Sequence, residues 1–255
     1  GVFATLLGLS PLLLLALLHV LFARHHDLVA LTINVLALYL TLGFRQFSHF
    51  YTDIQLALRL DDIERARSLL SAWRGEAVTA EDAGQISRLA IETALLASHR
   101  HVFAVLFWFV LLEPLGLGAI GALAYRMTHL LAESWRDHDE FGHFSAQAFR
   151  ALDWLPARAT AAAFAVVGNF EDAVYCWRNQ ASGWYDHELG IVLASGAGAL
   201  GVRLGRPEVS PNHGELGVGE TANVDFMQSA VGLVWRAIAL WLLLLFLLGL
   251  AKLAS

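Results

Sequence analysis

The stretch GVFATLLGLSPLLLLALLHVLF, residues 1–22, decides the fold class because it contains no Asp, Glu, Lys or Arg. At a rise of about 1.5 Å per residue, a helix of this length is about 33 Å long, which is enough to cross the hydrocarbon core of a bilayer. A backbone inside lipid must satisfy its own hydrogen bonds, so a helix is the expected state. The sequence therefore predicts a membrane span here. Residue 1 is Gly, so we also expect a start codon further upstream.

Two more long apolar runs follow. A polar break at residues 24–27 separates the first run from Leu28–Phe44, and the two together are expected to form a transmembrane helical hairpin. The last run is Ala230–Ala251, which carries Trp235 and Trp241 where an aromatic belt would lie, with Lys252 beyond it. The three runs predict three ordinary spans.

The composition agrees with a membrane protein. Hydrophobic residues make up 57% of the 255 residues and charged residues only 16%, whereas soluble domains average about 45–50% and about 25%. The net charge is −6 and the Lys and Arg residues are scattered, which excludes the basic patch that nucleic acid requires. The single cysteine excludes a disulfide framework within one chain. We therefore predict an all-α, polytopic integral membrane protein.

Residues 45–100 differ in character, since they combine many charges with apolar residues at helical spacing. Asp61 or Asp62 is expected to cap one helix, and Gly75 is expected to end it. A second amphipathic helix is expected over Glu81–Ala97. The seven arginines of this stretch favour the cytoplasmic side by the positive-inside rule. We interpret it as a water-exposed helical hairpin.

Three further apolar segments are short or interrupted. Val102–Tyr125 is broken by Glu113–Pro114, which leaves two alternatives open, one kinked span or a re-entrant hairpin. Leu155–Phe170 is expected to be a short, Ala-rich interior helix. The glycines of Ile191–Val202 suit either close backbone approach or a broken helix that lines a cavity. These segments predict short or broken membrane helices.

The resulting organisation has five parts. They are a transmembrane hairpin at 1–44, cytoplasmic amphipathic helices at 45–100, a core with broken membrane segments at 101–205, a loop at 206–229 and a C-terminal transmembrane helix at 230–255.

Several side chains could carry chemistry. His129 and Glu133 are spaced i, i+4, which would place both on one helix face as weak metal-ligand candidates. Asp153 could cap the helix that we expect to begin near Leu155, or it could position a ligand. Arg203 directly follows a run of small residues, where an arginine beside exposed backbone amides would suit a phosphate or a carboxylate, although an interfacial anchor is the alternative.

A family resemblance becomes visible in two blocks, DWLPAR at 153–158 and GALGVRLG at 198–205, with support from AVLFW at 104–108 and Tyr125–Arg126. These blocks resemble the CobD/CbiB membrane family, which includes adenosylcobinamide-phosphate synthase of cobalamin biosynthesis. The family also includes AmpE, an inner-membrane protein linked to β-lactamase induction. The resemblance extends from about Leu36 to Gly205 and implies a multi-pass protein of the bacterial inner membrane.

The chain departs from the synthases in two places. The synthases resemble one another in an acidic Glu-Asn-Thr-x-Asp-Gly run, whereas this chain has ASHRHV at 97–102. They also carry an Asn-x-x-Asp stretch where this chain has MTHLLAE at 127–133. An ATP-dependent ligase needs Mg²⁺ and acidic oxygen ligands, and Glu92, which matches the family, is one carboxylate. These losses favour a divergent member in which the synthase reaction is absent or changed.

The candidate ligand-binding residues are Glu92, His99, His101, Arg126, Asp153, Arg158 and Arg203, and no catalytic residue is assigned.

Three functions stay open. The first, which the missing acidic motif favours, is an AmpE-like protein that senses, binds or scaffolds. The second is an adenosylcobinamide-phosphate synthase, which joins aminopropanol phosphate to adenosylcobyric acid and would use Mg²⁺ and ATP. The third is an accessory subunit of a larger membrane complex. The expected partners are the lipid bilayer and either a second copy or a larger complex, but no nucleic acid.

Overall fold

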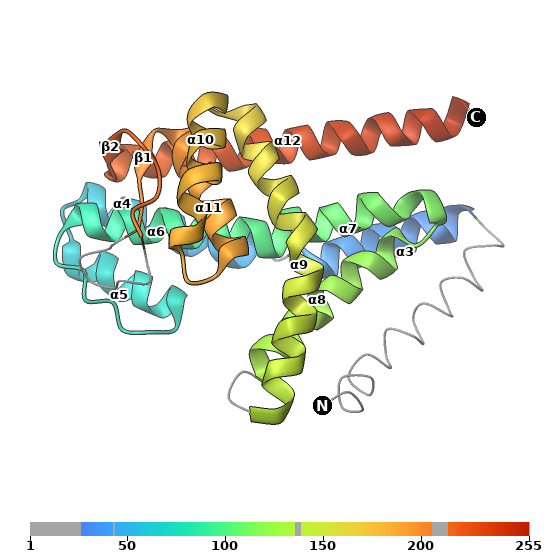
Figure 1. Cartoon of the computed structure of the whole chain (residues 1–255), viewed down its shortest axis with the longest axis horizontal. Helices are drawn as coiled ribbons and strands as arrows, with labels where there is room; N and C mark the ends of the chain where they lie inside the picture. The colour runs from blue at the N-terminus through green and yellow to red at the C-terminus, as the bar shows by residue number, and fades with distance from the viewer. Residues whose placement is uncertain (1–26, 43, 136–138, 206–213, 255) are drawn as a thin grey trace. The chain divides into compact units, whose positions relative to one another are not determined.

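The computed structural model describes residues 27–42, 44–135, 139–205 and 214–254, and these are mostly helical (Figure 1). The predicted span at 1–22 lies outside the described residues. The chain divides into two compact units. Unit 1 comprises Gly1–Gly43 and Arg100–Pro156, and unit 2 comprises Phe44–His99 and Ala157–Ser255.

In unit 1 three helices pack together, and a fourth begins there. Helix α3 (Asp27–Thr41) packs against α7 (Ala104–Leu112) and α8 (Gly118–Ser134). Helix α9 (Asp139–Val167) begins in unit 1 and continues past Pro156 into unit 2. α3 has 15 residues, about 22 Å at 1.5 Å per residue, so its described length is short for the span that we predicted at 28–44.

Helices α7 and α8 form a hairpin, which decides between the two alternatives for residues 102–125. The turn consists of the 3₁₀ helix η2 (Glu113–Leu115) and Gly116, whose φ of 69° is left-handed and favours glycine. A side chain at Gly121 would lie 2.7 Å from the carbonyl oxygen of Trp108, so this glycine allows the two helices to pack closely. The helices lie side by side in Figure 1. The backbone therefore reverses direction and is not one kinked helix.

Helix α6 (Ala83–Ser98) does not end where the sequence suggests a boundary. It continues through one π-helical turn, η1 (His99–Phe103), into α7. A π turn accommodates an extra residue within a helix and often occurs at functional sites. The polar HRH at 99–101 therefore interrupts the apolar pattern without interrupting the helix.

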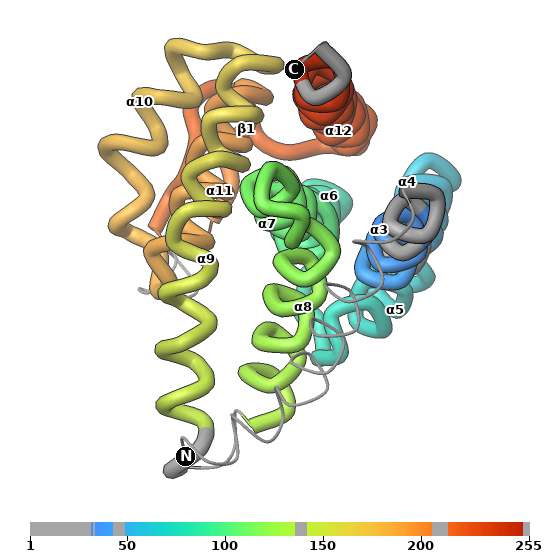
Figure 2. Tube along the Cα trace, turned by 90° about the vertical axis from the view of Figure 1, so that its right-hand side faces the viewer, coloured from blue at the N-terminus to red at the C-terminus, as the bar shows by residue number. Residues whose placement is uncertain are grey.

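Unit 2 is built around a small buried helix. Its elements are α4 (Phe44–Arg59), α5 (Ile63–Arg74), α6, the end of α9, α10 (Phe170–Gln180), η3 (Ala181–Gly183), α11 (His187–Leu200), β1 (Val202–Arg203), β2 (Glu220–Thr221) and α12 (Val224–Ala254). Helix α11 packs against α6, α10 and α12, and its contact with α10 can be followed in Figure 2. All residues from Leu189 to Ala199 are buried.

The prediction of a broken helix at 191–202 is wrong, because α11 is continuous to Leu200. Its glycines serve close helix packing instead. A side chain at Gly198 would collide with the backbone of Asp172 on α10, and one at Gly196 would lie 2.9 Å from Leu95 on α6. The alternative of close backbone approach is therefore the right one.

The helix capping predictions have mixed outcomes. The side chain of Asp62 accepts a hydrogen bond from the backbone N–H of Arg65 at 3.0 Å, and Gly75 ends α5 with a φ of 72°. Both predictions are confirmed. The short helix expected from Leu155 is wrong at its start, since α9 begins at Asp139 and contains Pro156 in its interior. Proline there removes one backbone hydrogen bond without ending the helix, so Asp153 is not a cap.

After α11 the chain forms a compact glycine-rich substructure. β1 and β2 pair in parallel, with Val202 opposite Glu220, and Leu204 bridges to Leu216. Gly217 and Gly219 have φ values of 92° and 107°, and a side chain at either position would collide with a backbone carbonyl of residues 201–202. The described non-helical part of the predicted 206–229 loop, residues 214–223, is thus folded onto the end of α11. The predicted end of the loop is wrong, because α12 begins at Val224.

Two helical stretches among the described residues are long and apolar enough to cross a membrane, Ala83–Leu115 and Val224–Ala251. The second contains the predicted span at 230–251. The first joins α6, η1, α7 and η2, so residues 102–112 are the end of a longer helix and not an isolated short one.

Candidate functional site

Unit 1 brings together several side chains from η1 and α8. Arg126 Nη1 donates to His101 Nδ1 over 2.6 Å. The rings of His101 and His129 are perpendicular, with centroids 6.1 Å apart. Arg100 precedes His101 in η1 and acts electrostatically on His129. We call these four residues, Arg100, His101, Arg126 and His129, the basic cluster.

His129 is the most buried member of the basic cluster, with 3% of its surface exposed. Its ring lies 5.0 Å from the ring of Phe149. Burial, followed by the positive charges of Arg100 and Arg126, lowers the pKa of His129 to about 3. The imidazole is therefore neutral at physiological pH.

Two carboxylates lie in unit 1 near the basic cluster. Asp153 is buried and accepts a hydrogen bond from the Tyr125 hydroxyl at 2.7 Å. Glu133 is about half exposed, and its Oε1 lies 3.7 Å from His129 Nε2. Asp153 is therefore oriented by a tyrosine from α8, and Glu133 sits at the outer side of His129.

Unit 2 holds a second group around Glu92 on α6. The buried Glu92 Oε1 accepts a hydrogen bond from the backbone N–H of Gly205 at 2.7 Å, and Arg88 Nε lies 3.9 Å from the same oxygen. Gly205 has a φ of 82°, and a side chain there would collide with the carbonyl oxygen of Gly214. Glu92 thus fixes the end of the GALGVRLG block through a charge-assisted hydrogen bond.

The remaining candidates lie elsewhere in unit 2. His99 Nδ1 is hydrogen-bonded to Thr160 Oγ1 at 2.9 Å, and both residues are fully buried. Arg158 is half-buried on α9. Arg203 is exposed, donates from Nε to the carbonyl of Gly219 at 2.8 Å and lies 3.7 Å from Glu215.

The backbone amides beside Arg203 are used within the fold. Leu204 N–H donates to Leu216, and Gly205 N–H donates to Glu92. Glu220 N–H donates to Gly201. An oxyanion at Arg203 would therefore have to be held by side chains, because these amides already have acceptors.

The His129–Glu133 pair offers two metal ligands at most. Among the described residues, no group of three or more His, Cys, Asp or Glu side chains could hold a metal ion. A metal at this pair would need water or substrate as its other ligands. No residue is therefore assigned to Mg²⁺ or to ATP.

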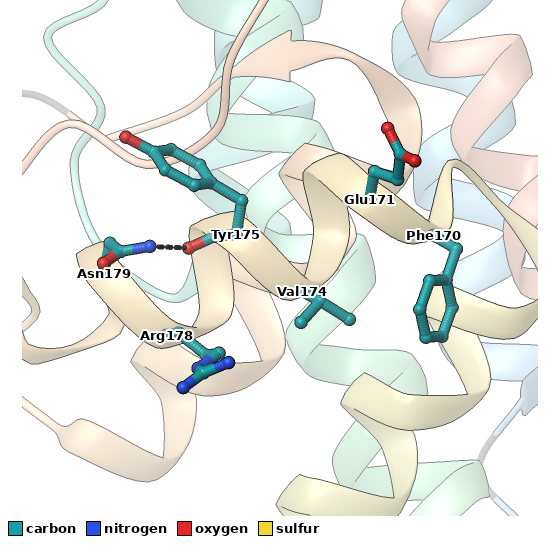
Figure 3. Close-up of a pocket in the computed structure, with 6 residues that line it drawn as sticks. All are labelled: Phe170, Glu171, Val174, Tyr175, Arg178 and Asn179. Atoms are coloured by element: carbon teal, nitrogen blue, oxygen red, sulfur yellow. Dashed lines mark hydrogen bonds between the residues drawn. The ribbon is translucent and has the colours of Figure 1, made fainter.

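None of these candidates lines the surface pocket of about 550 Å³ that unit 2 contains (Figure 3). All of its lining residues come from α10, and they include Phe170, Tyr175 and Arg178. Asn179 Nδ2 donates to the Tyr175 carbonyl at 2.8 Å, so this amide supports its own helix. One helix face does not surround a ligand, and we place no site here.

Sequence reasoning missed several partners of the candidate residues. Tyr125 and Arg100 were visible only as neighbours of Arg126 and His101, although Tyr125 and His129 share the i, i+4 spacing of one helix face. Arg88 stands at i, i+4 from Glu92 and could have been found in the same way. Glu92 and Gly205 are 113 positions apart in the sequence, so no local sequence pattern predicts their contact.

The arrangement defines a helical protein with two candidate membrane spans, a buried carboxylate holding a glycine-rich turn and a separate basic cluster. Comparison with known proteins identifies its family. The family model described as "CobD/Cbib protein" matches residues 1–245, so the chain belongs to the CobD/CbiB family.

Similar proteins carry names from one pathway. "Cobalamin biosynthesis protein CobD" of Stutzerimonas stutzeri is 33% identical over 96% of this chain and 80% of its own length. The protein of the same name from Chromobacterium violaceum is 36% identical over 84% of this chain and 70% of its own. "Cobalamin biosynthesis protein CbiB" of Salmonella typhimurium is 26% identical over 87% and 72%. No solved structure gives a significant match.

Proposed function

We propose that this chain is an adenosylcobinamide-phosphate synthase of cobalamin biosynthesis. In this reaction a carboxyl group of adenosylcobyric acid and the amino group of aminopropanol phosphate form an amide, driven by ATP. The names of the relatives support this function better than the AmpE-like function that we favoured from the sequence. Their matches cover most of this chain and are not confined to the apolar segments.

The observation that carries the proposal is the contact between Glu92 and Gly205. Both positions belong to the resemblance to the synthases, yet they are far apart in the sequence. A buried carboxylate is costly unless it is paired and hydrogen-bonded. Glu92 lies 3.9 Å from Arg88 and accepts from the backbone N–H of Gly205, so it fixes the conformation of the glycine-rich turn.

We also propose that the protein is embedded in the bacterial inner membrane with several spans. Of the segment 45–100 that we expected in the cytoplasm, we propose only residues 45–82 there, because Ala83–Leu115 is a candidate span. The end of α12 supports the membrane location, because its apolar side chains are exposed around the helix. Those at least 39% exposed are Leu242, Leu243, Leu244, Phe246, Leu247, Leu248 and Leu250. Contiguous exposed apolar surface of this kind marks contact with lipid or protein.

One observation favours the AmpE-like function as the second candidate. The π turn at His99–Phe103 holds HRH near the place where the synthases carry their acidic run. Under this function the basic residues would bind a ligand without forming an amide.

Growth of a mutant strain separates the two functions. The strain lacks its own synthase gene and receives cobyric acid under conditions that require cobalamin. We expect this chain to restore growth and its Glu92→Ala variant to restore less. If the chain reaches the membrane in normal amounts but growth stays at the level of the empty vector, the synthase proposal fails.

A further inference from the structure

The basic cluster of unit 1 contains donors that the fold itself does not use. Within the part of the chain that the structure describes, neither ring nitrogen of His129 makes a hydrogen bond, and the same holds for the buried Nε of Arg100. Buried polar groups are nearly always paired with protein or water. Two such groups in one cluster point to a ligand that supplies the acceptors.

Arg126 adds an accessible donor group. Its guanidinium makes a hydrogen bond to His101 through Nη1, and the side chain is only half-buried. An arginine has five N–H donors in a planar fork, which matches the oxygens of a phosphate. Arg126 can therefore contact an anion while it keeps its bond to His101.

Two acids near the cluster, Asp153 and Glu133, oppose the charge of its arginines. Asp153 accepts from the Tyr125 hydroxyl, and Glu133 is about half exposed, with its Oε1 3.7 Å from His129 Nε2. Asp153 is thus already hydrogen-bonded within unit 1. Glu133 is in a position to compete with an anion for His129.

We propose that Arg100, Arg126 and His129 bind the phosphate group of a phosphate monoester. The two arginines would neutralise its charge, and the neutral imidazole would donate one N–H. The inference rests on the proposed function in one respect, since aminopropanol phosphate is such a monoester. The same chemistry would also suit the headgroup phosphate of a lipid.

Binding can be measured without turnover. The full chain is purified, placed in nanodiscs of phosphatidylcholine and titrated with aminopropanol phosphate by calorimetry, in the absence of ATP and of the corrinoid. We expect Arg126→Gln to weaken binding about tenfold or more, as is typical for loss of a charge-assisted pair. Arg126→Lys should bind with intermediate affinity, because it keeps the charge but loses the fork.

Arg150→Gln is the matched control. Arg150 is exposed on α9 in the same unit, so its substitution changes the net charge equally. We expect it to bind like the parent, and Glu133→Gln to bind at least as tightly. Helix content and elution volume are compared for all variants, so that a folding defect is recognised.

A second arm distinguishes the source of the phosphate. Nanodiscs containing phosphatidic acid are compared with phosphatidylcholine alone, with phosphorus NMR of the lipid headgroup as the readout. If Arg126→Gln loses only the phosphatidic acid interaction, the phosphate belongs to a lipid. If Arg126→Gln and Arg126→Lys bind both probes like the parent, or if Arg150→Gln loses as much affinity, the proposal is overturned. Loss of binding with retained synthase activity would overturn the substrate assignment alone.

Discussion

Glu92 constrains the fold of unit 2, because its buried carboxylate accepts a hydrogen bond from the backbone N–H of Gly205. Removing one partner of a buried hydrogen bond leaves the other without an acceptor. We expect Glu92→Ala to lower the free energy of unfolding by about 1–3 kcal/mol.

Thermal unfolding in detergent checks this effect, with Glu64→Ala as the control. The Glu64 side chain is 83% exposed in its ion pair with Arg67, and such pairs contribute little. Equal melting temperatures for Glu92→Ala and Glu64→Ala would contradict the role given to Glu92.

The burial of His129 leads to a prediction about how the stability of the protein depends on pH. Its pKa falls from 6.5 to about 3 on folding, so between these values the unfolded chain binds a proton that the folded chain does not. This residue's contribution to stability is therefore present above about pH 6.5 and decreases as the pH falls towards 3. At pH 5 the loss is about 2 kcal/mol.

We expect His129→Gln to make the unfolding midpoint less sensitive to acid between pH 7.5 and 5, because glutamine does not titrate there. His143→Gln, at an exposed position on α9, should keep the acid sensitivity of the parent. The same acid sensitivity in His129→Gln and in the parent would contradict the assignment of a buried neutral imidazole.

At the scale of the elements, α11 needs small residues because it packs closely against α10. Its glycine at 198 lies against the backbone of α10, with the Cα of Ala173 only 2.8 Å from where a side chain would begin. We expect Gly198→Ala to destabilise unit 2 by roughly 1–3 kcal/mol through this overpacking. Gly232→Ala on α12 is the control, since nothing lies within 4 Å of the added carbon.

For Gly232→Ala the change should be neutral or stabilising by up to about 1 kcal/mol, from helix propensity alone. Denaturant unfolding followed by circular dichroism measures both variants. A Gly198→Ala protein as stable as Gly232→Ala would show that α10 and α11 are not packed as described.

Local signals predicted some elements and missed others. The cap at Asp62 and the stop at Gly75 were predictable because each depends on neighbouring residues alone. The start of α9 was missed, because we expected a helix to begin near Leu155, whereas α9 begins at Asp139 and runs through Pro156. The basic cluster is formed by side chains of η1 and α8 that tertiary packing brings together. Its residues are visible in the sequence, but their proximity could not be predicted from it.

At the scale of the whole molecule, the proposed membrane location accounts for the exposed apolar surface of α12. We predict that Leu247→Cys on α12 reacts with a water-soluble maleimide at least about tenfold more slowly than Glu64→Cys, because a thiol in lipid lacks water and does not ionise. The natural Cys176 is buried and burial raises its pKa to about 11, so it should give little background. Equal labelling rates in intact membranes would contradict a lipid-embedded α12.

The most direct test of the synthase function is product formation by the purified protein. It is incubated with adenosylcobyric acid, aminopropanol phosphate, ATP and Mg²⁺, and the corrinoid products are separated and identified by mass. We predict adenosylcobinamide phosphate from the parent chain and markedly less from Glu92→Ala. Complete absence of this product, under conditions in which a synthase of proven activity forms it, would contradict the proposed function.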